Sequence, residues 1–184
     1  RGDIYEQQEA FDKAIADYTT AIQTTPDSYE PYVARGLLYQ NTGRYDEAFQ
    51  DFQKALQLNP QSIHANMSLG NLYIRKRDLE TALIYFNQAV KIDPNNATVY
   101  FSRATVYEGR KEWDKAIADY QAAINIDPKF TEAYYEMGVD YQAQNKLEQA
   151  IKAYDDAISI DPTYVNAYIK RAAVYAQMGK VPEA

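Results

Sequence analysis

Five of the seven prolines recur at a fixed interval of 34 residues, at positions 26, 60, 94, 128 and 162. A spacing this regular indicates an internal repeat, which has to be defined before any other feature is interpreted. Placing these prolines at position 32 of a 34-residue unit gives four full units and two partial ones. The predicted single array covers residues 1–184, with full units at 29–62, 63–96, 97–130 and 131–164 and partial units at 1–28 and 165–184.

Other columns of the repeat support this frame because they were not used to build it. Position 11 is tyrosine in every unit, position 8 is glycine or alanine, and positions 20 and 27 are alanine. Position 24 is always aromatic. In the second unit these columns hold Tyr39, Gly36, Ala48, Ala55 and Phe52.

The columns predict two amphipathic helices in each unit. In the second unit, Tyr32, Gly36 and Tyr39 follow the spacing of one apolar helix face, and residues 45–55 form a matching stripe on a second helix. The segment 41–44 between them contains a glycine, as helix ends often do. Because one pair cannot bury both stripes alone, neighbouring pairs must stack. The sequence therefore predicts an all-α solenoid of antiparallel helix pairs.

This pattern resembles the tetratricopeptide repeat family, which carries small residues at positions 8, 20 and 27, aromatic residues at 11 and 24, and proline at 32. The resemblance covers the whole chain and implies a superhelix with a concave groove lined by the first helices. Asn66 departs from the tyrosine at position 4 of the other full units, which suggests a softer contact there. Arg35, Arg103 and Arg171 replace the leucine that is usual at position 7.

Both ends of the sequence cut through a repeat. Residues 1–5 align with residues 35–39, so the first partial unit is expected to begin within a truncated first helix. Residues 181–184 align with the start of a second helix, whereas solenoids usually end in a polar capping helix. We therefore expect a fragment of a longer array, whose uncovered ends could support homo-oligomers.

The family resemblance implies that positions 2, 5, 9, 12 and 13 of the first helices face the groove. Exposed rows of apolar side chains usually mark contact sites. The alternative for position 5 is that its side chains pack into the seam between units. The candidate partner-binding residues are Val33, Leu37, Met67, Asn71, Arg75, Phe101, Thr105, Tyr135, Val139 and Ile169. The expected partner is a protein or peptide segment with apolar anchors and a basic flank.

Composition argues against several other functions. A chain without cysteine has no disulfide, thiolate nucleophile or cysteine metal site. The net charge of −7 disfavours nucleic acid and anionic membranes, and no apolar run reaches the ~20 residues that cross a bilayer. The basic run Arg75–Arg77 is better explained as the complement of a helix C-terminus. His64, the single histidine, has no motif beside it that would supply a nucleophile or metal ligands. We expect no enzymatic activity, no cofactor and no metal.

The leading interpretation is a non-enzymatic protein-protein interaction scaffold that binds a partner segment in the groove. Two alternatives remain open from the sequence: the array could be an arm of a larger multidomain enzyme, or it could be a self-association module. The compartment is not determined, and the cytoplasm is the default expectation because the chain has no cysteine and no visible signal segment.

Overall fold

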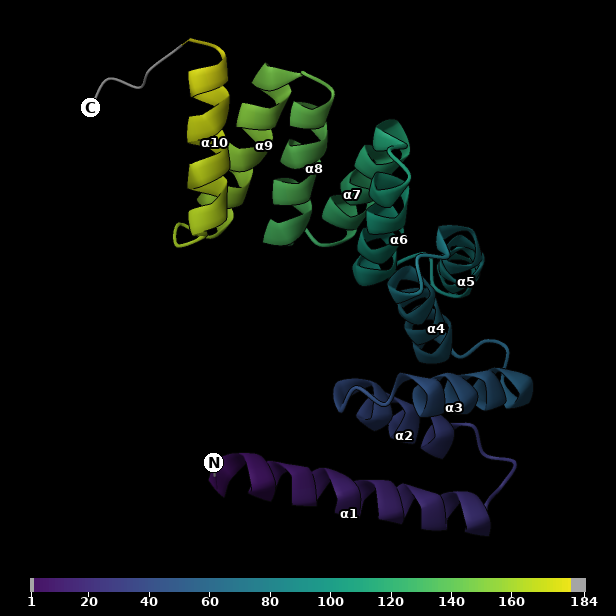
Figure 1. Cartoon of the computed structure of the whole chain (residues 1–184). Coiled ribbons are helices and arrows are strands. Elements are labelled where there is room, and N and C mark those ends of the chain that lie inside the picture. The colour runs from purple at the N-terminus through teal and green to yellow at the C-terminus, as the bar shows by residue number, and fades with distance from the viewer. Residues whose placement is uncertain (1, 180–184) are drawn as a thin grey trace. The chain divides into compact units, whose positions relative to one another are not determined.

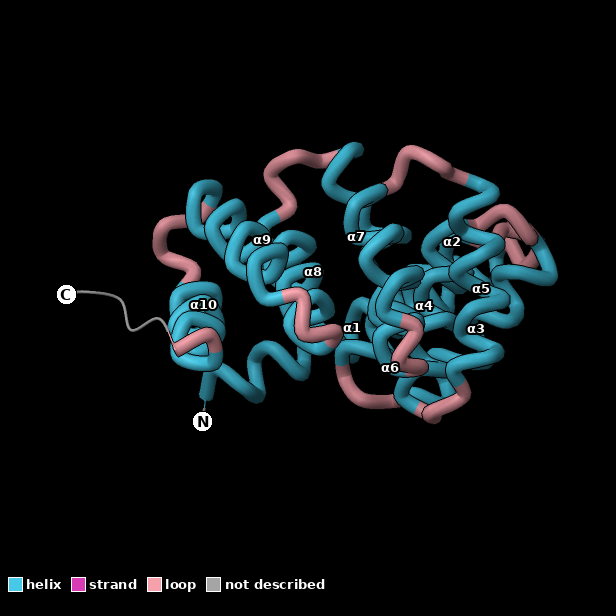
Figure 2. The backbone as a smooth tube through the Cα atoms, turned by 90° about the horizontal axis from the view of Figure 1, so that it is seen from above, coloured by secondary structure: helices cyan, strands magenta, loops and turns pink. Residues whose placement is uncertain are grey.

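The computed structural model describes the backbone of residues 2–179 and the side chains of residues 9–179. Within this range the chain forms ten α-helices joined by short loops, and no strand (Figures 1 and 2). It divides into two compact parts, each containing several repeats, which we describe separately. From here on, the first unit is Arg1–Ile92, the second unit is Asp93–Ala184, and a 34-residue segment is called a repeat. The all-α class predicted from the repeat is confirmed.

The first unit contains five helices, each of which packs against the next one along the chain. They are α1 (Gly2–Thr24), α2 (Glu30–Asn41), α3 (Tyr45–Leu58), α4 (Ile63–Arg75) and α5 (Leu79–Ile92). The second unit follows the same scheme. Its helices are α6 (Ala97–Gly109), α7 (Trp113–Ile126), α8 (Thr131–Ala143), α9 (Leu147–Ile160) and α10 (Val165–Gln177). From α2 to α9, each predicted first helix is thus followed by its second helix.

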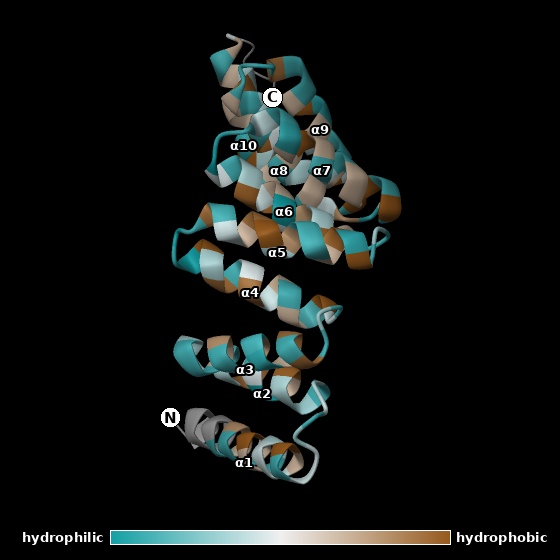
Figure 3. Cartoon of the chain, turned by 90° about the vertical axis from the view of Figure 1, so that its right-hand side faces the viewer, coloured by the Kyte–Doolittle hydropathy of each residue, from teal (hydrophilic) through white to brown (hydrophobic). Residues whose placement is uncertain are grey.

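Figure 3 shows hydrophilic and hydrophobic residues interspersed along the helices. The core of each unit contains the alanine and aromatic columns of the repeat, together with aliphatic side chains such as Leu69 and Ile124. Ala48 and Phe52 have no exposed surface in the first unit, and Ala116 and Tyr120 have none in the second. The apolar stripes read from the sequence are therefore the ones that pack.

Glycine at position 8 is explained by its contact with the aromatic ring at position 24. A Cβ atom added to Gly70 would lie 2.7 Å from the ring of Phe86, and one added to Gly138 would lie 2.6 Å from the ring of Tyr154. Such distances are well below van der Waals contact. The glycines therefore allow the two helices of a pair to approach with the ring between them.

The turn between paired helices uses a left-handed residue at position 15. These residues are Gly43, Arg77, Lys111, Asn145 and Gly179, with φ of 78, 60, 59, 59 and 68°. In the four turns followed by a second helix, the next N–H donates to the carbonyl of the position-11 tyrosine, as from Arg44 to Tyr39 at 2.8 Å. This bond is typical of a Schellman helix end. The predicted helix end at Gly43 is confirmed, and three other turns form without glycine.

Lys111→Gly should stabilise the second unit, because a lysine pays a steric cost at φ 59° that glycine does not. We expect a gain of about 0.5 to 1 kcal/mol after the larger backbone entropy of glycine in the unfolded chain is subtracted. Urea unfolding followed by the fluorescence of Trp113 measures it. Asn145→Gly is the matched control and should gain little, since asparagine tolerates this conformation. A larger gain at Asn145 than at Lys111 would contradict the explanation.

Helix α1 differs from the partial repeat expected at this end of the chain. The repeat frame aligns residues 7–10 with the turn at 41–44, but α1 runs without a break from Gly2 to Thr24. The aligned sequence Gln-Gln-Glu-Ala has no glycine and consists of good helix formers, so the helix continues through it. The second helix expected to start near residue 181 lies outside the described residues.

None of the helices between residues 2 and 179 has the combination of length and apolar character that a membrane-spanning helix needs.

Candidate functional site

The first-helix face of the first unit is formed by α2 and α4, which contact each other. Val33 is buried in the core beneath this face. Met67 and Asn71 are half-buried, and Leu37 is 37% exposed. Of the apolar candidates in this unit, Leu37 is therefore the one with most surface available to a partner.

The predicted basic residues lie at the end of α4 and stack on aromatic rings. The guanidinium carbon of Arg75 is 4.1 Å from the ring centroid of Tyr45, and Nζ of Lys76 is 4.4 Å from that of Phe49. Positive charge at a helix C-terminus is favoured by the helix dipole, and cation–π contact adds to this. Both basic side chains thus have a structural role within the unit.

In the second unit, the position-5 side chains pack against aromatic rings that precede the next first helix. Phe101 stacks on Phe130 with ring centroids 4.8 Å apart, and Tyr135 meets Tyr164 edge-on at 5.4 Å. Both candidate rings are half-buried. They occupy the seam between successive helix pairs, as the alternative interpretation of position 5 anticipates, and only part of each ring faces outwards.

The remaining candidates of the second unit differ in exposure. Thr105 and Val139 are half-buried, and the hydroxyl of Thr105 donates to the carbonyl of Ser102 at 2.8 Å. Ile169 on α10 is 61% exposed, so it is far more accessible than the half-buried Phe101 and Tyr135 at the same position of the repeat.

Three acidic side chains, Glu108 on α6 and Glu136 and Asp140 on α8, form a cluster on the first helices of the second unit. Burial and the negative charge of Glu108 raise the pKa of Glu136 to about 7, although Lys170 acts in the opposite direction. Burial, Glu108 and Glu136 together raise the pKa of Asp140 to about 7. The carboxyl groups of Glu136 and Asp140 therefore ionise near neutrality because of their surroundings.

Tyrosines of the second helices orient polar groups at position 12 of the first helices. The hydroxyl of Tyr120 donates to Glu108 Oε2 at 3.2 Å, and that of Tyr154 donates to Gln142 Oε1 at 3.2 Å. In the first unit the ring of Phe52 has no hydroxyl group, and Oε1 of Gln40 is buried without a hydrogen-bond partner. The polar side chain at position 12 thus accepts a hydrogen bond from the ring at position 24 in the second unit, whereas Gln40 of the first unit receives none.

Phe52→Tyr should stabilise the first unit by about 1 kcal/mol, because the new hydroxyl can donate to Gln40 Oε1. The repeat that contains Tyr154 shows that a tyrosine fits beneath a glycine at position 8. Hydrogen exchange of the α2 and α3 amides measures the effect. Phe86→Tyr is the matched control, since its position-12 neighbour is Ile74, which accepts no hydrogen bond. Stabilisation by both variants would show that the acceptor is not the cause.

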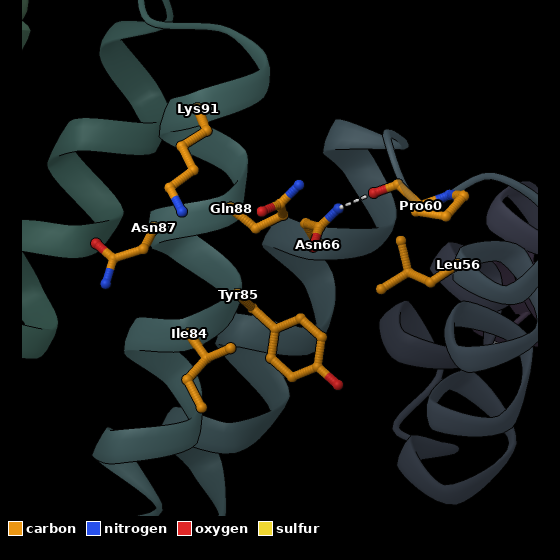
Figure 4. A pocket seen from close by; sticks show the side chains of 8 residues that line it. All are labelled: Leu56, Pro60, Asn66, Ile84, Tyr85, Asn87, Gln88 and Lys91. Atoms are coloured by element: carbon orange, nitrogen blue, oxygen red, sulfur yellow. Dashed lines mark hydrogen bonds between the residues drawn. The ribbon is translucent and has the colours of Figure 1, made fainter.

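Asn66 keeps the hydrogen bond that tyrosine makes at position 4 but leaves a pocket. Its amide donates to the carbonyl of Pro60 at 3.2 Å (Figure 4). The hydroxyl of Tyr32 likewise donates to the carbonyl of Pro26 at 3.4 Å. Beside it lies an open pocket of about 470 Å³ lined by Leu56, Pro60, Asn66, Ile84, Tyr85, Asn87, Gln88 and Lys91. At its edge Ile84 is 67% exposed. The sequence signal for this pocket is that Asn66 replaces the tyrosine found at position 4 of the other full repeats.

Two of the arginines at position 7, Arg35 and Arg103, are paired with aspartates at position 23 of the same repeat. Arg35 donates to both carboxylate oxygens of Asp51 at 2.8 and 2.7 Å, and Arg103 does the same to Asp119 at 2.7 and 2.7 Å. Arg171 pairs instead with Asp155 of the preceding helix. Arg35 and Arg103 therefore replace the usual leucine with bidentate ion pairs that join the two helices of a repeat. Their sequence signal was the joint occurrence of Arg and Asp.

The described residues contain no group of three His, Cys, Asp or Glu side chains arranged to hold a metal ion. His64 lies on the exposed side of α4, within its first turn.

Comparison with known proteins agrees with this architecture. A tetratricopeptide repeat profile matches residues 2–67 and 69–135, and a TPR repeat profile matches residues 138–179. The chain belongs to the tetratricopeptide repeat family. A search of curated proteins gives no match.

Solved structures share the fold. MamA is 26% identical, with a TM-score of 0.78 over 89% of this chain and 96% of that one. YrrB, described as a TPR protein with an unusual peptide-binding site, is 22% identical, with a TM-score of 0.75 over 89% and 84%. PilF of Pseudomonas aeruginosa is 18% identical, with a TM-score of 0.75 over 83% and 69%. Family and fold together support a general role as a protein-interaction scaffold.

Proposed function

We propose that the first-helix face of each unit binds a segment of a partner protein. In the first unit this face is carried by α2 and α4, and in the second by α6, α8 and α10. The observation that carries the proposal is the partial exposure of apolar side chains on these helices, with Leu37 at 37%. Leu37, Met67 and Val139 would contact apolar anchors of the partner.

Other candidate residues have different parts in this proposal. Val33, Phe101 and Tyr135 form the floor of the face, because they are buried or half-buried against the core. Asn71 and Thr105 offer polar contacts, and Arg75 and Ile169 lie towards the margins. An extended or helical segment suits such a surface, since both present side chains at regular intervals. The fold shared with YrrB makes a peptide a reasonable occupant.

A random peptide library displayed on phage and selected against the intact protein supplies a probe without knowledge of the partner. The selected peptide should bind the Leu37→Glu variant about tenfold more weakly, because a charge replaces an exposed apolar side chain of the face. Isothermal titration calorimetry measures the affinity. Circular dichroism of each variant confirms that the fold is kept.

Ile84→Glu is the matched control. Ile84 is also an exposed aliphatic side chain, but it lies on the second helix α5 beside the pocket lined by Asn66 and Tyr85. Binding should be unchanged in this variant. If Ile84→Glu weakens the peptide and Leu37→Glu does not, the site lies between α3 and α5 and the proposal is wrong for the first unit.

A further inference from the structure

The acidic cluster on the second unit has the features of a recognition site for positive charge. Resting on the function proposed above, we infer that Glu108 and Glu136, above the buried carboxyl group of Asp140, bind a lysine or arginine side chain of the partner segment. The cationic side chain would lie on the first-helix face between α6 and α8.

The position of the three carboxyl groups follows from the helices that carry them. Glu136 and Asp140 are four residues apart on α8, so they are neighbours on one helix face. Glu108 lies near the end of α6, where the hydroxyl of Tyr120 donates to its Oε2 atom at 3.2 Å. Glu108 and Glu136 are half-buried and can be reached by a ligand, while Asp140 lies beneath the surface with no exposed area.

Asp140 is the observation that points to a ligand. Both of its carboxylate oxygens are buried, and neither has a hydrogen-bond partner. The equivalent position 10 holds Leu72, Val106 and Val174 in other repeats, and all three are buried. A buried carboxylate without a partner is costly, and two further carboxylates nearby increase that cost. A cation bound at the cluster would supply the missing favourable charge.

The surrounding groups of the second unit do not neutralise the cluster. Burial, followed by the charges of Glu108, Glu136 and Asp140, raises the pKa of Tyr120 on α7. Burial, followed by Tyr135, Glu136 and Asp140, raises the pKa of Tyr154 on α9, so both hydroxyl groups remain neutral. Lys170 on α10 is a positive group that acts on Glu136. Its effect is smaller than those of burial and of Glu108, so the pKa of Glu136 stays near 7.

An organic cation fits better than a metal ion. Among residues 9–179, no three acidic side chains converge closely enough to hold a metal. A guanidinium or ammonium group can bridge more widely spaced carboxylates, and arginine can donate to several at once. The first unit lacks the equivalent charges, since positions 6, 10 and 12 of α2 and α4 hold Ala34, Ser68, Leu38, Leu72, Gln40 and Ile74. The inferred preference therefore belongs to the second unit.

The test uses the same peptide library selected on the intact protein at pH 8. Selected peptides should be enriched in arginine or lysine at one position, and norleucine at that position should weaken binding about tenfold. The double variant Glu108→Gln with Glu136→Gln keeps side-chain size and should show a similar loss. Lys170→Gln should instead strengthen binding, because it removes a competing positive charge.

The pH dependence of binding gives an independent readout. Because the carboxyl groups of Glu136 and Asp140 have a pKa of about 7, affinity for a cationic peptide should rise between pH 6 and pH 8 and affinity for its norleucine analogue should not.

The two levels of the proposal can fail separately. If peptides depend on Val139 of the second unit but norleucine binds as well as arginine and the double variant has no effect, the cation site is wrong and the scaffold function remains. If the selected peptides are insensitive to every substitution on the first helices of both units, the proposed function itself is wrong, and the cation site with it.

Discussion

Replacing Asp140 with valine should raise the free energy of unfolding at pH 8 by about 2 to 4 kcal/mol. The carboxyl group is fully buried and has no hydrogen-bond partner. Burial and the charges of Glu108 and Glu136 raise its pKa to about 7, so at pH 8 the folded protein carries a buried negative charge. Val106 and Val174 occupy the same position of the repeat and are fully buried, which shows that valine fits this environment.

The gain from Asp140→Val should depend on pH. Between an ordinary pKa near 4 and the folded value of about 7, the folded chain keeps a proton on Asp140 that the unfolded chain has released. The contribution of Asp140 to the stability of the native protein is therefore fully present below pH 4 and is lost as the pH rises through 7. The variant loses this contribution but keeps the similar one from Glu136, so its stability should fall less steeply between pH 5 and pH 8.

Unfolding in urea at pH 5 and at pH 8, followed by the fluorescence of Trp113, tests this expectation. Trp113 is the single tryptophan and begins α7, so it reports on the second unit. Asp140→Asn serves as the control, because it removes the charge but leaves a polar group buried, and it should recover only part of the gain. A gain of equal size at both pH values, or a loss at pH 8, would show that ionisation of Asp140 does not limit stability.

The helix pairs are predictable from the sequence because each repeat carries its own start and end signals. The proline interval, the position-8 glycine and the position-24 ring locate both helices and their crossing without any knowledge of distant contacts. The exception is α1, where residues 7–10 lack a turn signal and the helix continues. A repeat frame assigns a turn by alignment, whereas the backbone responds to the local residues.

The exposure of the candidate face was harder to predict, because it depends on residues 29 positions later in the chain. Phe101 and Tyr135 are partly covered because Phe130 and Tyr164 lie before the next first helix. In the first unit the same position holds Ser62, which caps α4 by accepting from the N–H of Ala65 at 3.4 Å. Position 5 and position 34 have to be read together to see which side chains remain available.

The acidic cluster could not be recognised from a single helix. On α8 alone, Glu136 and Asp140 are an ordinary pair of polar residues. When neighbouring helices pack together, the side chain at position 10 becomes buried. Asp140 is unusual because it is a carboxyl group in this buried position. The apolar residues at position 10 of the other repeats were the available sequence signal.

Removing one partner of the Arg103–Asp119 ion pair should destabilise the second unit strongly. The side chains are only 17% and 9% exposed, and two hydrogen bonds of 2.7 Å join them between α6 and α7. Asp119→Ala leaves the guanidinium group in this partly buried position without its carboxylate. We expect a loss of about 2 to 3 kcal/mol, most of it from the lost charge pairing with Asp119.

The chain itself offers the control for this prediction. The repeat at 131–164 has methionine and alanine at the two positions, Met137 and Ala153, and both are buried there. The double variant Arg103→Met with Asp119→Ala copies this apolar solution and should recover most of the stability lost by Asp119→Ala, because no buried charge remains. Urea unfolding of the two single variants and the double variant completes the cycle. If the double variant is as unstable as the sum of the single ones, the pair contributes through packing of each side chain, and charge pairing is not what couples α6 to α7.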